Sequence, residues 1–270
     1  MRRPRTSEAA RASDALDGRA RAFYVDVLRR LRADGVPFLI GGAYALERYT
    51  GVSRRVKDID IFVRPADRDR ALAPLAQAGY VTEVTSPVWL GKARCGARFV
   101  DVIFSSGNGV AEVDDEWFAH AEPGQVLGVP VDFCPAEETI WSKAYVMERE
   151  RYDGADVLHL VRARGPRMDW ERLLRRFGPH WRVLLSHLVL FGFVYPGEQH
   201  LVPDGVLCEL LGRLETERAR PPEVGALCQG TLLSKAQYRT DIERWGFRDG
   251  RLRPTGKITS RQAAALDRDP

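Results

Sequence analysis

Several features that mark particular protein classes are scarce or missing in this sequence. The 270 residues include only four cysteines, which lie far apart and form no Cys-x-x-Cys pair. We therefore expect neither a zinc site nor a disulfide framework. The basic N-terminal stretch lacks the apolar core of a secretory signal. The most apolar run, Val183 to Tyr195, is too short to span a bilayer and is expected to be a buried helix. A cytoplasmic, reduced protein with no membrane partner is the expectation.

A strong excess of charge of either sign is also missing. The chain has 41 lysines and arginines against 37 aspartates and glutamates, a formal net charge of +4, and its pI is about 9.0. Such a balance suits a phosphate-bearing partner, but many arginine-rich soluble proteins share it. Charge alone therefore favours RNA only slightly.

The order of the predicted elements indicates an α+β fold. Residues 1–15 show no apolar period and are expected to form a disordered tail. Short strands and helices then alternate up to residue 134, and helical spacing dominates from residue 135 to 222. Runs of strands followed by runs of helices are typical of α+β chains. We predict a mixed β-sheet flanked by helices over 16–134, a helical domain over 135–222, and a weakly structured C-terminal region and tail over 223–270.

The stretch from Phe38 to Val63 carries the first chemical signal. It predicts a strand, a Gly-Gly turn, a short helix, a basic loop and a second strand that contains Asp58 and Asp60. Residues two apart in a strand share a face, so both carboxylates point the same way. Two adjacent carboxylates repel each other unless a cation lies between them. Mg²⁺ prefers such oxygen ligands, although an Asp-x-Asp pair on a solvated strand face is the common alternative.

A glycine pair and a basic loop flank this predicted site. Gly41 and Gly42 precede a short helix, whose free N–H groups bind anions readily, and glycine lets the backbone approach a phosphate closely. A simple turn is the alternative interpretation of the pair. Ser53 and Arg55 lie in the loop before the aspartate strand and are predicted to face the substrate.

Asp101 is a third acidic candidate. It lies in RFVDVIF, the second strand of a predicted hairpin that turns near Cys95 and Gly96. Burying an unpaired carboxylate in an apolar strand is costly. Asp101 is therefore expected either to face a solvated cleft or to contact a positive group.

Lys143 lies on a helix predicted to start at Pro135. It is a candidate phosphate contact, or it belongs to a solvated helix face. Asp153 and Asp156 follow it. Instead of taking part in the site, these two aspartates could serve as a helix cap and as ion-pair partners of Arg149 and Arg151.

The combination of Gly41-Gly42, the DID strand and Asp101 resembles the signature of the polymerase-beta-like nucleotidyltransferase superfamily. The segment PAEETIWSKAYVMERERYDGADVLHL, with Lys143, Arg149, Asp153 and Asp156, is similar to the abortive-infection toxin branch, a type IV toxin–antitoxin group. The resemblance implies that residues 16–134 form a nucleotidyltransferase-like domain. It also implies that Asp58, Asp60 and Asp101 are catalytic and hold metal, and that the glycine pair contacts nucleotide phosphate.

The function expected from this resemblance is metal-dependent transfer of an NMP from an NTP to an acceptor hydroxyl, with release of pyrophosphate. Mg²⁺ or Mn²⁺ is the expected cofactor, and an NTP such as ATP the expected substrate. The acceptor stays open among RNA or tRNA, a small molecule and a protein, and an antitoxin is an expected partner of the toxin branch. A catalytically silent member of the fold that binds a nucleotide, RNA or protein is the alternative.

Overall fold

The computed structural model describes residues 17–54, 58–220 and 224–267. The tail expected over residues 1–15 lies outside this part of the chain. The chain divides into two compact units, one formed by Met1–Pro135 with Ala264–Pro270 and the other by Ala136–Ala263. Within the described ranges, no helix is both long enough and apolar enough to cross a membrane.

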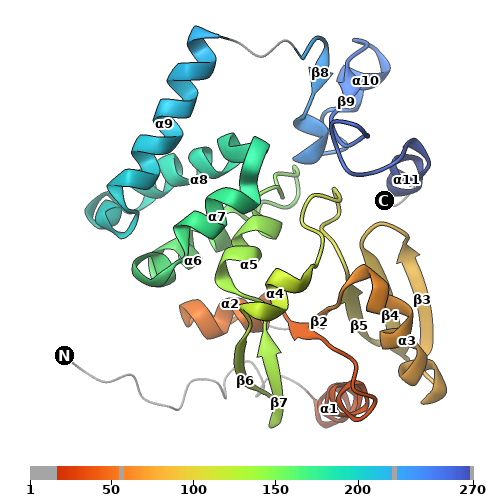
Figure 1. Ribbon diagram of the computed structural model, residues 1–270. Helices are drawn as coiled ribbons and strands as arrows, with labels where there is room; N and C mark the ends of the chain where they lie inside the picture. Colours follow the sequence, from red (N-terminus) through yellow and green to blue (C-terminus); the bar gives the residue numbers. More distant parts are fainter. Residues whose placement is uncertain (1–16, 55–57, 221–223, 268–270) are drawn as a thin grey trace. The chain divides into compact units, whose positions relative to one another are not determined.

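The first unit is built on a mixed β-sheet, as the predicted α+β fold requires. Its strands are β1 (Leu39–Ile40), β2 (Ile59–Phe62), β3 (Val81–Ser86), β4 (Leu90–Cys95), β5 (Arg98–Ile103), β6 (Glu122–Val126) and β7 (Val129–Phe133). In the described residues these form a seven-stranded sheet in the order β3-β4-β5-β2-β1-β7-β6 (Figure 1). The pairs β2–β5 and β1–β7 are parallel, and the other neighbouring strands are antiparallel.

Two helices, α1 and α3, cover one face of this sheet. Between residues 17 and 135, the described helical elements of the unit are α1 (Gly18–Ala33), α2 (Gly42–Thr50), η2 (Pro65–Asp67), α3 (Arg68–Gln77) and α4 (Asp115–Ala119). α1 packs against α3, β5 and β7, and α3 packs against β3, β4 and β5. A Cβ atom added to Gly91 of β4 would lie 3.3 Å from Leu72 Cδ1 of α3, so Gly91 faces α3. Its cross-strand partner Val102 shares that covered face.

The second unit is mostly helical. It contains α5 (Ala136–Lys143), α6 (Gly154–Arg164), η3 (Gly165–Arg167), α7 (Trp170–Phe177), η4 (Gly178–His180), α8 (Trp181–Val194), η5 (Pro196–Leu201) and α9 (Asp204–Ala219). Beyond these lie β8 (Leu227–Cys228), η6 (Gly230–Leu232), α10 (Arg239–Glu243) and β9 (Arg248–Asp249), and α11 (Ser260–Leu266) follows at the end of the described chain. The buried helix expected over Val183 to Tyr195 is α8, but only one side of it is buried, because Val189 is 61% and Phe193 is 82% exposed.

Buried charges connect α5 to α7 inside this unit. The Arg172 guanidinium lies 2.7 Å from Glu137 Oε2, and Arg176 Nε donates to Glu138 Oε1 at 3.1 Å. Burial raises the pKa of Glu138, while the charges of Arg172 and Arg176 act in the opposite direction. The two arginines thus offset part of the cost of a carboxylate that is fully enclosed in the core.

Candidate functional site

The structure brings the three predicted carboxylates together. Asp58 lies directly before β2, Asp60 lies within β2, and Asp101 lies within β5. One carboxylate oxygen from each residue lies within 4.8 Å of the other two, and all three residues are half-buried. Because carboxylate oxygens are the ligands that Mg²⁺ prefers, this cluster suits a hard divalent cation.

The register of two parallel strands explains this convergence. Asp60 is the direct partner of Asp101 in the β2–β5 pair. Their neighbours Ile59 and Val100 are fully buried on the opposite face, which α1 and α3 cover. The alternation of side chains along each strand therefore places the acids on the face that α1 and α3 leave uncovered.

The glycine pair lies against the same face. Gly41 donates its N–H to the Asp60 carbonyl at 3.0 Å, and Gly42 has a positive φ of 55° as α2 begins. A Cβ atom on Gly42 would lie 1.7 Å from Asp60 Oδ2, and one on Gly41 would lie 2.2 Å from the Phe62 ring. Both positions therefore need glycine so that the start of α2 can approach β2.

Lys92 is a site residue that the sequence reasoning missed. Its Nζ atom donates to Asp101 Oδ1 at 2.5 Å, and the two residues are direct cross-strand partners in β4 and β5. The positive group expected beside Asp101 is therefore Lys92. A tight turn at Gly96 fixes this register, so the hairpin prediction contained a signal that could have found the pair.

The charge of the acidic cluster also affects the pKa of Tyr24 in α1. Burial raises the pKa of its hydroxyl group, and the negative charge of Asp58 adds to that rise. The residue is only 1% exposed, so the charge of Asp58 acts on a hydroxyl group that lies in the core.

The remaining predicted nucleotide contacts are more dispersed. Ser53 lies exposed in the segment after α2. Arg55 lies outside the residues that the structure describes. Lys143 belongs to the second unit, where its Nζ atom lies 2.8 Å from both Asp153 Oδ2 and Asp156 Oδ2. The alternative that Lys143 belongs to a solvated helix face is therefore wrong, because its side chain is only 16% exposed and is paired with two aspartates. Its contact with phosphate stays a prediction.

The ion pairs around Lys143 include one that the sequence offered as an alternative. Arg151 donates to Asp153 at 3.0 Å. Burial acts to raise the pKa of Asp153, but the hydrogen bond from Arg151 and the charge of Lys143 hold it below its usual range. Asp153 is also the N-cap residue of α6, where its side chain makes no capping hydrogen bond within the described helix.

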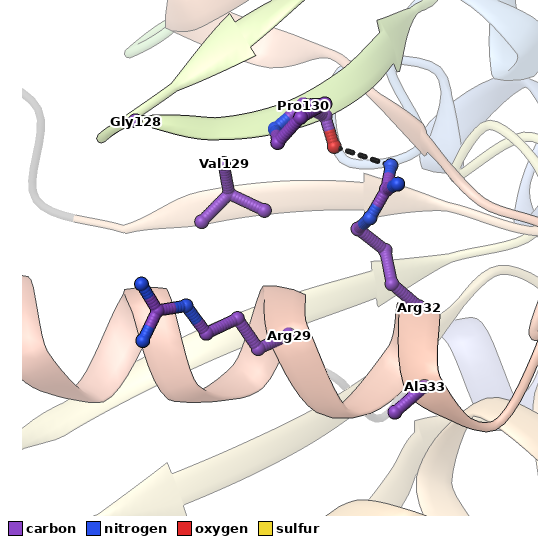
Figure 2. Close-up of a pocket in the computed structure, with 6 residues that line it drawn as sticks. All are labelled: Arg29, Arg32, Ala33, Gly128, Val129 and Pro130. Atoms are coloured by element: carbon purple, nitrogen blue, oxygen red, sulfur yellow. Dashed lines mark hydrogen bonds between the residues drawn. The ribbon is translucent and has the colours of Figure 1, made fainter.

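A shallow hollow of about 440 Å³ lies elsewhere on the first unit. It is lined by Arg29, Arg32, Ala33, Gly128, Val129 and Pro130. Figure 2 shows Arg32 crossing from α1 to donate to the Pro130 carbonyl, at a distance of 2.7 Å. Its walls come from α1 and the β6–β7 hairpin rather than from the acidic cluster, so we do not assign it to the nucleotide.

Several solved structures resemble this chain. The antibiotic-resistance factor ANT(2'')-Ia in solution is 18% identical, with a TM-score of 0.41, over 76% of this chain and 97% of its own. The lincosamide antibiotic adenylyltransferase LnuA, bound to lincomycin, is 15% identical, with a TM-score of 0.37, over 54% of this chain and 96% of its own. JHP933 from Helicobacter pylori is 11% identical, with a TM-score of 0.37, over 80% of this chain and 99% of its own.

A search of curated proteins finds no match to the sequence. A family model described as an uncharacterised nucleotidyltransferase, however, matches residues 5–180. This match spans more than half of the chain and includes the glycine pair and all three clustered acids. The chain therefore belongs to this nucleotidyltransferase family.

Proposed function

We propose that the protein transfers an NMP group from an NTP to an acceptor hydroxyl, with Asp58, Asp60 and Asp101 as the centre of the reaction. The observation that supports this most directly is the convergence of the three carboxylates from β2, the residue before it and the paired strand β5. In the reaction, the acceptor oxygen forms a bond to the α-phosphorus. The bond from that phosphorus to the bridging oxygen breaks, and pyrophosphate leaves.

The acidic cluster fits a divalent cation on structural grounds. Three half-buried carboxylates within 4.8 Å of one another repel strongly unless positive charge lies among them. Asp58 and Asp60 would hold Mg²⁺ or Mn²⁺, with Asp101 completing the ligand set. When bound, such an ion offsets the charge that develops on the phosphates.

The chain's own groups would orient the reactants. The start of α2 lies against Asp60, so its backbone N–H groups would direct the NTP phosphates toward the acids. Asp101 would also accept the proton that the acceptor hydroxyl loses. Ser53, Arg55 and Lys143 are the further proposed phosphate contacts, and Lys143 would have to exchange its present aspartate partners to act in this way.

Turnover of NTPs by single variants tests the proposal. We expect Asp58→Asn and Asp60→Asn to lose at least about a hundredfold in turnover, since each removes a ligand charge from the transition state. Asp132→Asn is a matched control, because Asp132 is an exposed acid on β7 of the same sheet. Wild-type turnover in both site variants would refute the assignment.

The acceptor can be identified by following the label. The protein is incubated with α-labelled NTPs and, separately, with total RNA, small hydroxyl compounds and protein. We propose RNA, and tRNA in particular, as the first acceptor to test, because the net charge of +4 favours a polyanion. RNA labelling that a co-expressed neighbouring protein suppresses would support the toxin branch and an antitoxin partner. Metal binding with no labelled acceptor would favour a catalytically silent member.

A further inference from the structure

Lys92 is a cationic side chain that contacts the acidic cluster directly. Its ammonium donates to Asp101 Oδ1 at 2.5 Å. The two side chains are only 15% and 14% exposed, so water screens this pair less than it screens a surface ion pair. Lys92 therefore neutralises the negative charge of Asp101 without any added ion.

The position of the ammonium is fixed on two sides. Lys92 and Asp101 are paired in the β4–β5 register, which sets the distance between their Cα atoms. The Lys92 Nζ atom also lies 4.6 Å from the centroid of the Phe99 ring, two residues before Asp101 on the same face. A cation over an aromatic face is attracted by the ring. The ammonium is thus held where it must contact Asp101.

A divalent cation coordinated by Asp101 needs the same carboxylate. Asp58 and Asp60 come from the β2 segment, whereas Lys92 pairs with the acid from β5. A cation bound by Asp58 and Asp60 is also repelled by the positive charge of Lys92 on the other side of Asp101, because like charges repel each other strongly at short range. The ion pair and metal coordination at Asp101 therefore exclude one another in part.

We propose that Lys92 is an internal competitor for Asp101, which makes metal binding at the third carboxylate depend on displacing this lysine. The inference rests on the proposed function, because it assumes that the cluster binds a divalent cation. Without metal, Lys92 keeps Asp101 beside the other acids. With metal, the lysine gives up this carboxylate and its ammonium becomes available to the incoming phosphates. Lys92 is thus a positioning residue that regulates occupancy of the site.

Binding of Mn²⁺ to the nucleotide-free, full-length protein tests this, with free Mn²⁺ followed by electron paramagnetic resonance. We expect Lys92→Met to bind Mn²⁺ at least about tenfold more tightly than the wild type, because water-like screening already gives one unit charge this effect on a nearby divalent ion and the site is screened less. Lys92→Arg keeps the charge and should stay close to the wild type. A merely structural ion pair predicts the opposite sign, because its loss would loosen the acids and weaken Mn²⁺ binding.

A double-mutant cycle with Asp101→Asn isolates the competition. The tightening caused by Lys92→Met should shrink when Asp101 can no longer serve as the contested ligand. Equal or weaker Mn²⁺ binding by Lys92→Met, or the same tightening in the Asp101→Asn background, would overturn the role of Lys92. If neither the wild type nor Lys92→Met binds Mn²⁺, the proposed metal site itself is refuted. Thermal unfolding of each variant verifies that the compared proteins are folded.

Discussion

Gly42→Ala is the substitution that tests most directly how the fold positions the site. The alanine Cβ would lie 1.7 Å from Asp60 Oδ2, whereas real Cβ contacts essentially never fall below 3.0 Å. The carboxylate oxygen must therefore move from 1.7 Å to at least 3.0 Å, a shift of at least 1.3 Å. The Asp60 side chain can make this movement by rotating, so the main damage is to the geometry of the acidic cluster rather than to the core.

Two separate effects of the substitution can be estimated. Gly42 has a φ of 55°, and placing a residue with a side chain in this left-handed region costs about 1–2 kcal/mol in the free energy of unfolding. Misplacing a catalytic group by about 1 Å can cost on the order of a hundredfold in rate. We therefore expect a modest loss of stability and a disproportionate loss of Mn²⁺ affinity and of turnover.

Gly51→Ala supplies the matched control on the same helix. Gly51 ends α2 with a φ of 72°, and the space around its missing Cβ is open to at least 4 Å among the described residues. Urea denaturation of both variants measures the backbone cost, and Mn²⁺ binding measures the effect on the cluster. We expect similar losses of unfolding free energy in the two variants and weakened Mn²⁺ binding in Gly42→Ala alone. Equal Mn²⁺ affinity in the two variants would refute the claim that Gly42 exists to accommodate Asp60.

Two further predictions concern the second unit. Arg172→Met should lower the free energy of unfolding by about 3–5 kcal/mol, because it leaves Glu137 buried without its arginine and Glu138 with Arg176 alone. The exposed Arg175→Met on the same helix is the control, and equal urea midpoints for the two variants would contradict the reasoning. Burial holds the pKa of His187 below its usual range, so the unfolded chain binds a proton at this residue more readily than the folded chain. The neutral His187 side chain therefore contributes to stability above about pH 6.5, and this contribution is lost as the pH falls. His187→Gln, whose amide can still donate to the Ala144 carbonyl, should therefore lose less unfolding free energy than the wild type between neutral and mildly acidic pH; parallel pH profiles would exclude this role for His187.

Much of the fold could be predicted because local patterns determine it. Helical spacing predicted α1, and Asp17 caps it through the Ala20 N–H, as its residue type allows. The β4–β5 hairpin followed from alternation and a turn signal. β6 could not be predicted, because Pro123 and Gly124 lie inside it and disfavour a central strand. It forms as an edge strand beside β7, and edge strands tolerate proline.

The candidate site was predictable in composition but less so in its contacts. Alternation put Asp58 and Asp60 on one face, but only the parallel β2–β5 register shows that Asp101 is the partner of Asp60. Lys92 was missed because a hairpin prediction without an exact register assigns no cross-strand partner. Gly42 was predicted as a phosphate contact, and the structure adds a steric reason for glycine that concerns Asp60 itself. Nonlocal pairing supplies information that single-sequence patterns lack.

The strand connectivity also determines the order in which the charges of the site can meet during folding. The Lys92–Asp101 pair belongs to a local hairpin, and hairpins form within microseconds. The Asp60–Asp101 pair needs parallel pairing across α3, β3 and β4, which is a slower event because a long segment must first close. Refolding kinetics with and without Mn²⁺ can resolve these stages, since a metal held by acids from both β2 and β5 should alter only the later one. Along this pathway, the first cation that Asp101 encounters is supplied by the chain itself.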